Sequence, residues 1–196
     1  MMQSNGFVRE LIEYVVTFLV VLVIMLGVRH FIVAPFQVDG RSMDYTLADQ
    51  ERLFMWRRGS LDHFDVITFH PPHKEDTLYV KRIIGLPGDT IEYKNDTLYL
   101  NGQAVDEPYL DQKKSETDGN FTQDFTLEEV TGETVVPEGM MFVLGDNRRN
   151  SVDSRSFGFV SQDAFEGRAF FKFWPLSHMG KLTNYGLNEA GQLVVE

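Results

Sequence analysis

The 196-residue chain contains no cysteine. A disulfide framework, a thiolate zinc site and a cysteine nucleophile are therefore excluded. The length is sufficient for one ordinary domain with a sizeable core plus a short additional segment, so the fold needs neither a disulfide nor a metal to hold it. The sequence is compatible with any compartment, including an extracytoplasmic one that does not rely on disulfides.

Positive charge is also scarce. The chain has 18 lysines and arginines against 29 aspartates and glutamates, which gives a formal net charge of -11. Two arginines and two glutamates cancel within residues 1–36, so the whole negative excess lies on residues 37–196. Nucleic-acid binding requires a positively charged surface, so we expect no nucleic-acid partner. The simplest interpretation of the acidity is that it serves solubility.

One long apolar run occurs near the N-terminus. Tyr14–Val28 carries no charge, and fifteen helical residues span about 22 Å, which is shorter than a hydrocarbon core of about 30 Å. Extension to Leu11–Val33 gives enough length and places Glu13, Arg29 and His30 near the two interfaces, where long side chains can reach water. The run therefore predicts a transmembrane helix.

Two other interpretations of this run are a cleaved signal peptide and a buried core helix. The start has one arginine and two glutamates, and no small-x-small cleavage site follows the apolar residues. We therefore predict that residues 1–34 form a tail and an uncleaved anchor, followed by a second domain over residues 35–196. Arg9 and Arg29 flank the run equally, so charge does not fix its orientation.

After Pro35 the pattern becomes strand-like. Residues 90–94 and 97–100 alternate in polarity around an Asn-Asp turn, and Asn101-Gly102 offers a second hairpin turn into residues 103–105. Short apolar strands are predicted at residues 141–144 and 168–174. Frequent turns between short strands indicate a mostly β domain. The polar stretch within residues 106–135 is interpreted as an exposed loop or a small insertion.

Two segments contain candidate reactive groups. Ser42 follows a glycine-containing turn, and a serine in such a place is ordinarily a turn residue. Lys81 interrupts an apolar, strand-like run, where the ordinary interpretation is an edge-strand or snorkelling lysine. The alternative is a buried amine, whose pKa burial would lower from about 10.4. Such a neutral lysine can act as a general base.

Two further clusters of polar residues have a plain and a functional interpretation. Residues 145–158 are dense in short polar and charged side chains, which suits either a solvated loop or a network that orders a buried site. His63, His70 and His73 lie close together in sequence. Two prolines prevent a helical histidine pair, and no acidic ligand pattern accompanies them, so we predict no metal site and no cofactor.

Three segments together resemble the type I signal peptidases of bacteria: GRSMDYTL at 40–47, YVKRIIGLPGD at 79–89 and GDNRRNSVDSRSFG at 145–158. Weaker agreement comes from FDVITF at 64–69, NGQAVDEPYL at 101–110 and GRAFFKFWPL at 167–176. The resemblance covers most of residues 8–180 and is nearest to the Gram-positive branch of the family. It implies a serine endopeptidase with a mostly β catalytic domain, built from antiparallel sheets with a small insertion.

The resemblance also implies a setting and partners. The chain would cross the cytoplasmic membrane of a bacterium once, with its N-terminus inside and its catalytic domain outside. Exported pre-proteins and the lipid bilayer would be its partners, with no metal and no nucleic acid. Signal peptides would be removed after a small-x-small site, Ala-x-Ala in its commonest form.

By match to the family, Ser42 is the nucleophile and Lys81 its base, a Ser–Lys dyad that replaces the Ser-His-Asp triad. Ser151 matches the serine that hydrogen-bonds and orients the lysine. The resemblance assigns supporting roles to four charged residues, namely Asp153, Arg155, Asp146 and Arg148. It assigns substrate contacts to Phe36, Val38, Gly40, Met43, Tyr79 and Val80. The oxyanion hole would use the backbone N–H of Ser42, because Gly40 lacks the hydroxyl that some members supply there.

One departure from the family pattern is Tyr45, where the motif usually has proline. Proline fixes φ and would shape the turn after the nucleophile, so tyrosine relaxes that constraint. An alternative hypothesis is therefore a catalytically weak or narrow-client paralogue, which binds or processes a dedicated partner.

Overall fold

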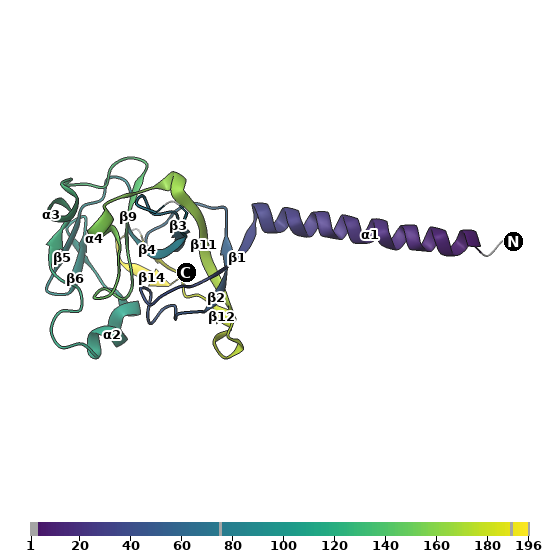
Figure 1. Ribbon diagram of the computed structural model, residues 1–196. Helices are drawn as coiled ribbons and strands as arrows, with labels where there is room; N and C mark the ends of the chain where they lie inside the picture. The colour runs from purple at the N-terminus through teal and green to yellow at the C-terminus, as the bar shows by residue number, and fades with distance from the viewer. Residues whose placement is uncertain (1–3, 75, 189, 196) are drawn as a thin grey trace.

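The computed structural model describes residues 4–74, 76–188 and 190–195. Figure 1 shows a long N-terminal helix that projects from a β-rich body. This helix, α1 (Ser4–Phe31), contains an apolar stretch, Gly6–Arg29, with mean hydropathy 2.7 and no part buried inside the protein. Because no part of this stretch is buried, the interpretation of the apolar run as a buried core helix is wrong. The first three residues of the predicted tail and the side chain of His30 lie outside the described part.

The ends of α1 differ from the predicted ones for local reasons. The helix starts before Leu11, where an ion pair of 3.2 Å between Arg9 and Glu13 joins successive turns. It ends at Phe31 because Val33 already pairs with Trp56 in the sheet. The first strand of the body therefore begins two residues before the predicted domain start at residue 35.

The main sheet is antiparallel and has the order β1-β2-β11-β3-β4-β9-β10, with β12 paired to β11. The predicted strands at 141–144 and 168–174 are confirmed as parts of β9 and β11. The strands of this sheet are β1 (Val33–Gln37), β2 (Arg52–Trp56), β3 (Val66–Phe69), β4 (Tyr79–Gly85), β9 (Met140–Leu144), β10 (Val160–Ser161), β11 (Phe165–Trp174) and β12 (Gly180–Lys181).

A second antiparallel sheet has the order β7-β6-β5-β8. Both predicted hairpin turns are confirmed: Asn95 and Asp96 have φ of 50° and 62°, and Asn101 and Gly102 have 53° and 77°. Two consecutive positive φ values give the turn whose twist matches that of the strands it joins. The strands are β5 (Ile91–Lys94), β6 (Thr97–Leu100), β7 (Gln103–Val105) and β8 (Phe125–Thr126).

Residues 106–135 form structured parts of this second unit. They contain three short helices, η1 (Pro108–Leu110), α2 (Asp111–Ser115) and α3 (Leu127–Thr131), together with the edge strand β8. Phe121 and Leu127 are buried, so of the two interpretations the insertion describes this region better than an exposed loop. The remaining elements are α4 (Ser154–Phe157), η2 (Gln162–Ala164), η3 (Leu176–His178), β13 (Tyr185–Leu187) and β14 (Leu193–Val195).

Buried apolar residues in the described part of the chain form three hydrophobic clusters, and two of them position the parts of the site. The larger one joins the two sheets, because β4 and β9 of the main sheet and β5 and β6 of the second contribute to it. A smaller cluster packs on one face of the main sheet; its members are Val38, Met43, Leu47, Leu53, Val66, Val80, Ala169 and Leu182.

We predict that Leu98→Ala lowers the free energy of unfolding by about 2–5 kcal/mol, because Leu98 is 0 % exposed in the larger cluster. Leu176→Ala is the matched control, since Leu176 is 69 % exposed, and it should change stability by no more than about 0.5 kcal/mol. Denaturant unfolding of the full chain in detergent measures both. Equal effects of the two substitutions would contradict the assigned core.

Candidate active site

The amine of Lys81 lies inside the body, next to the hydroxyl of Ser42. Strand β4 is buried on both faces from Val80 to Gly85, and Lys81 is 4 % exposed. Its Nζ donates to Ser42 Oγ at 2.7 Å and to the Val80 carbonyl at 3.0 Å. Burial lowers the pKa of Lys81 to about 8, although the negative charges of Asp153 and Asp146 act in the opposite direction. The structure therefore brings together the two residues predicted as base and nucleophile.

The backbone around Ser42 is held on both sides. Before it, Gly40 has a φ of 88°, which favours glycine, and its N–H donates to the Asp49 carboxylate at 2.8 Å. The Ser42 carbonyl accepts the N–H of Asn147 at 2.9 Å, and the Asn147 side chain donates to the Arg41 carbonyl at 3.0 Å. The N–H of Ser42 itself has no acceptor within the described part of the chain. It is therefore available to a bound carbonyl oxygen.

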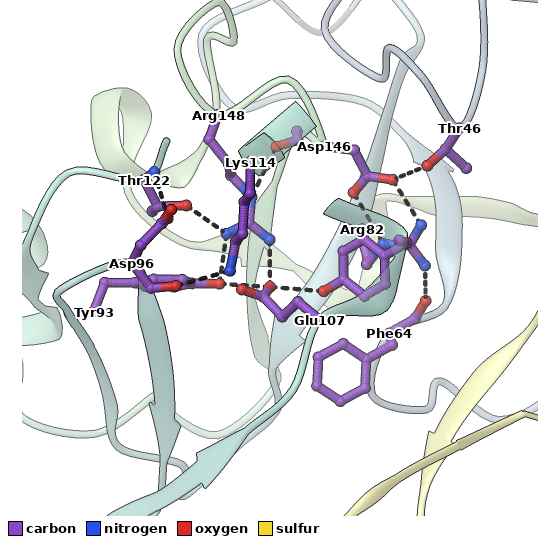
Figure 2. A network of polar contacts seen from close by, with 12 residues as sticks. Thr46, Phe64, Arg82, Tyr93, Asp96, Glu107, Lys114, Thr122, Asp146 and Arg148 are labelled. Atoms are coloured by element: carbon purple, nitrogen blue, oxygen red, sulfur yellow. Dashed lines mark hydrogen bonds and ion pairs between the residues drawn. The ribbon is translucent and has the colours of Figure 1, made fainter. Parts of the chain in front are cut away.

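Asp146, predicted as a supporting residue, anchors the loop after β9 through a buried ion pair. Figure 2 shows its carboxylate between Arg82 and Thr46. Arg82 donates to it through Nε at 2.9 Å and Nη2 at 2.6 Å, and the Thr46 hydroxyl donates at 2.5 Å. Arg82 follows Lys81 in β4, so the two side chains leave opposite faces of the strand. Asp146 thus connects the strand of the base with the turn of the nucleophile.

Arg148, also predicted as supporting, connects this loop to the second sheet. Its Nη2 donates to Glu107 at 2.5 Å, and the hydroxyl of Tyr93 donates to the same carboxylate oxygen at 2.8 Å (Figure 2). The hydroxyl of Tyr109 also donates to this oxygen, at 2.7 Å. The Arg148 Nε donates to the Gly145 carbonyl at 3.1 Å. The Arg148–Glu107 ion pair is completely buried. Through Glu107, the insertion therefore helps to hold the backbone of residues 145–148, which lies beside Ser42.

Asp153 and Arg155 form the third ion pair, which closes this loop. Arg155 donates through Nε and Nη2 to the two oxygens of Asp153, both at 2.8 Å. Asp153 also accepts the N–H of Gly145 at 3.0 Å, and Arg155 reaches the Arg148 carbonyl at 2.9 Å. The four predicted supporting residues thus hold the backbone of residues 145–155. The sequence analysis missed three supporting residues, namely Arg82, Glu107 and Asn147. Only Arg82 had a clear signal in the sequence, because an arginine within an apolar strand indicates a buried ion pair.

Ser151 lies at the site but does not make the contact expected of it. Its Oγ is buried and has no hydrogen-bond partner among the described residues. A Cβ built on Gly145 would lie 2.2 Å from this Oγ and 2.5 Å from the Ser42 carbonyl oxygen. Ser151 is therefore packed against Gly145 and the nucleophile turn. The orientation of Lys81 by Ser151 stays a prediction.

A cavity of about 410 Å³ opens over the Ser42–Lys81 pair. Four predicted substrate-binding residues line it, namely Phe36, Gly40, Tyr79 and Val80. Thr77 and Leu78, from the edge at residues 77–80 where the resemblance places the substrate strand, line it as well. Further lining residues that the sequence analysis missed are Thr68, Lys74, Asn150 and Val152. Among the described residues, strand β1 pairs only with β2, and the first residues of β4 pair only with β3, so each has an edge beside the cavity to which no described strand pairs.

Two predicted substrate-binding residues, Val38 and Met43, do not line this cavity. They are 2 % and 0 % exposed and pack in the smaller hydrophobic cluster together with Val80. Their apolar side chains therefore support the turn of the nucleophile from one face of the sheet. Direct contact of these two residues with a substrate stays a prediction.

The histidines set aside in the sequence analysis have structural partners. His63 lies 2.6 Å from the Asp89 carboxylate, and His70 lies 3.4 Å from Glu166. No group of three or more His, Cys, Asp or Glu residues is arranged to hold a metal ion within residues 4–74, 76–188 and 190–195.

We predict that Gly145→Ala lowers kcat by about 100-fold while the chain still folds. The added methyl group would displace Ser151 and the Ser42 carbonyl, and a shift of about 1 Å in a reacting group can cost this factor. Gly180→Ala is the control, because a Cβ there meets nothing within 4 Å. Steady-state peptide cleavage measures both, and wild-type kcat in Gly145→Ala would contradict the described packing.

Comparison with known proteins agrees with this geometry. The family described as "Signal peptidase, peptidase S26" matches residues 11–174. Signal peptidase I of Bacillus caldolyticus is 52% identical over 152 residues, which are 75% of this chain and 82% of that protein. Signal peptidase IB of Staphylococcus aureus is 42% identical over 178 residues, 86% of this chain and 92% of that protein.

A solved structure is similar as well. The crystal structure of a signal peptidase I from Enterococcus faecalis V583 is 51% identical and has a TM-score of 0.54, covering 56% of this chain and 97% of that one. The matched segment, the level of identity and the antiparallel fold agree on one assignment. The chain belongs to the signal peptidase family, peptidase S26, and is a peptide-bond hydrolase of the signal peptidase I type.

Proposed function

We propose that the chain cleaves exported pre-proteins with a Ser42–Lys81 dyad. The observation that carries this proposal is the 2.7 Å contact between Ser42 Oγ and a lysine amine that is almost completely buried. A pKa lowered to about 8 leaves a useful fraction of Lys81 neutral near neutral pH. A neutral amine at hydrogen-bond distance can accept the hydroxyl proton.

The reaction proceeds in two halves. Ser42 Oγ attacks the scissile carbonyl while Lys81 takes its proton, and the N–H of Ser42 stabilises the oxyanion. Lys81 then gives the proton to the leaving amine, which becomes the N-terminus of the mature protein. The signal peptide stays bound to Ser42 as an ester. Water attacks this ester with Lys81 again as base, and the proton that Lys81 takes returns to Ser42 Oγ.

The cavity supports binding of an extended peptide. The free edges of β1 and of the start of β4 can add a substrate strand through main-chain hydrogen bonds, and side chains of the cavity select alternate residues. Phe36 and Val80 would bound the space for the side chain before the cut. Each methylene that does not fit costs about 1–3 kcal/mol, which accounts for a small-x-small preference.

The helix α1 supports a membrane location for the reaction. Its apolar length is sufficient to cross a bilayer once, and it leads directly into β1 at the edge of the cavity. We propose that the N-terminus lies on the cytoplasmic side of a bacterial cytoplasmic membrane and the body on the outer side. The catalytic pair would then meet pre-proteins that are still held by their apolar segments.

We predict that Ser42→Ala and Lys81→Ala each lower kcat by at least about 10³-fold on a pre-protein with an Ala-x-Ala site, measured in detergent. Loss of the nucleophile or of its base removes the same chemical step, so the double variant should be no slower than either single one. Ser156→Ala and Lys181→Ala are matched controls, because both residues are exposed and lie outside the cavity.

A folded wild-type chain that does not cut this pre-protein would contradict the proposal and favour the weak or narrow-client alternative. The structure gives that alternative no specific support. Tyr45 does not line the cavity; its hydroxyl donates to Glu116, and Lys113 lies 4.4 Å from its ring centroid. Tyr45→Pro would be the next variant in that case.

A further inference from the structure

A second cavity lies between the end of α1 and the body. Its volume is about 630 Å³, within the range of ordinary ligand sites. The lining residues come from the last turns of α1, from β1, from β2 and the residue after it, and from the segment before β4; they are Leu26, Arg29, Ala34, Pro35, Phe36, Met55, Arg57 and Leu78. Six of these eight residues have apolar side chains, and the other two are arginines.

The second cavity lies beside the catalytic one. Phe36 and Leu78 line both cavities, so the two cavities mark a path over these residues from Ser42 to the end of α1. The junction is fixed by backbone contacts, because the Arg57 N–H donates to the Ile32 carbonyl at 2.8 Å and Arg58 Nε donates to the Phe31 carbonyl at 3.2 Å. These contacts hold the end of α1 against the residues after β2, and so they fix the position of the second cavity.

The two arginines on this path differ in their charge balance. Arg57 is paired with Glu166 at 2.6 Å, so its charge is largely compensated. Arg29 is exposed at the end of the apolar stretch of α1, and no described residue forms an ion pair with it. The field along the path is therefore positive near Arg29, where the helix meets the body.

We propose that this second cavity binds the stretch of the pre-protein that connects its membrane-embedded segment with the residues next to the cut, and that Arg29 selects against a cation in this stretch. The inference rests on the proposed function. A pre-protein held in the bilayer beside α1 must run from the end of α1 to Ser42, and the two neighbouring cavities lie along that route. Apolar walls accept neutral side chains, while a lysine would meet Arg29 with like charge.

The test uses the full chain in detergent and one pre-protein with an Ala-x-Ala site. Glutamine, lysine or glutamate is placed singly at each position from the fourth to the seventh before the cut, and kcat/KM is measured for each. The enzymes are wild type, Arg29→Gln and Arg29→Glu. Arg9→Gln is the matched control, because Arg9 is an exposed arginine at the opposite end of the same helix.

For at least one position, wild type should cleave the lysine substrate about two- to fivefold more slowly than the glutamine one, the range expected for exposed charge pairs. Arg29→Gln should remove the difference, Arg29→Glu should reverse the order of lysine and glutamate, and Arg9→Gln should behave as wild type. Higher salt should reduce the difference, because it screens exposed charges.

If the lysine-to-glutamate ratio is the same for all four enzymes while the glutamine substrate is cleaved, the inference is overturned and the proposed function stands. If no enzyme cleaves the glutamine substrate, the proposed function fails, and the inference fails with it.

Discussion

Burial of the Lys81 amine against the Ser42 hydroxyl is the constraint on which the rest of the site depends. A charged ammonium loses its hydration inside β4, so its neutral form is favoured there. An exposed lysine would stay protonated and could accept no proton from serine. The burial of β4 on both faces therefore serves catalysis as well as packing, because it sets the protonation state of Lys81.

A basic lysine is useful only if the serine is held next to it, and three ion pairs provide this. Asp146–Arg82, Glu107–Arg148 and Asp153–Arg155 balance one another's charge and fix the loop after β9. Burying such pairs costs desolvation free energy, so they contribute less to stability than to a unique arrangement of the backbone. The insertion takes part through Glu107, which makes the second sheet a support of the catalytic loop.

Local patterns predicted the parts of this protein that local chemistry determines. The two hairpin turns and strand β9 follow from Asn, Asp and Gly positions and from apolar runs. Ser42 and Lys81 were found as a pair through the resemblance of their segments. The inward packing of Val38 and Met43 could not be predicted, because their partners come from β2, β3, β4 and β11, which only the folded sheet brings together. The partner of Arg148 could not be predicted either, since Glu107 lies 41 residues away, in the insertion after β7.

The most direct test of this account is the pH dependence of kcat/KM, which reports the pKa values of the free enzyme. Only the neutral form of Lys81 accepts the Ser42 proton, so activity rises with pH while the ammonium form predominates. With a substrate that does not titrate between pH 6 and 10, the account predicts a rise that levels off above a pKa of about 8. A rise that continues to about pH 10.4, the ordinary lysine pKa, would contradict it.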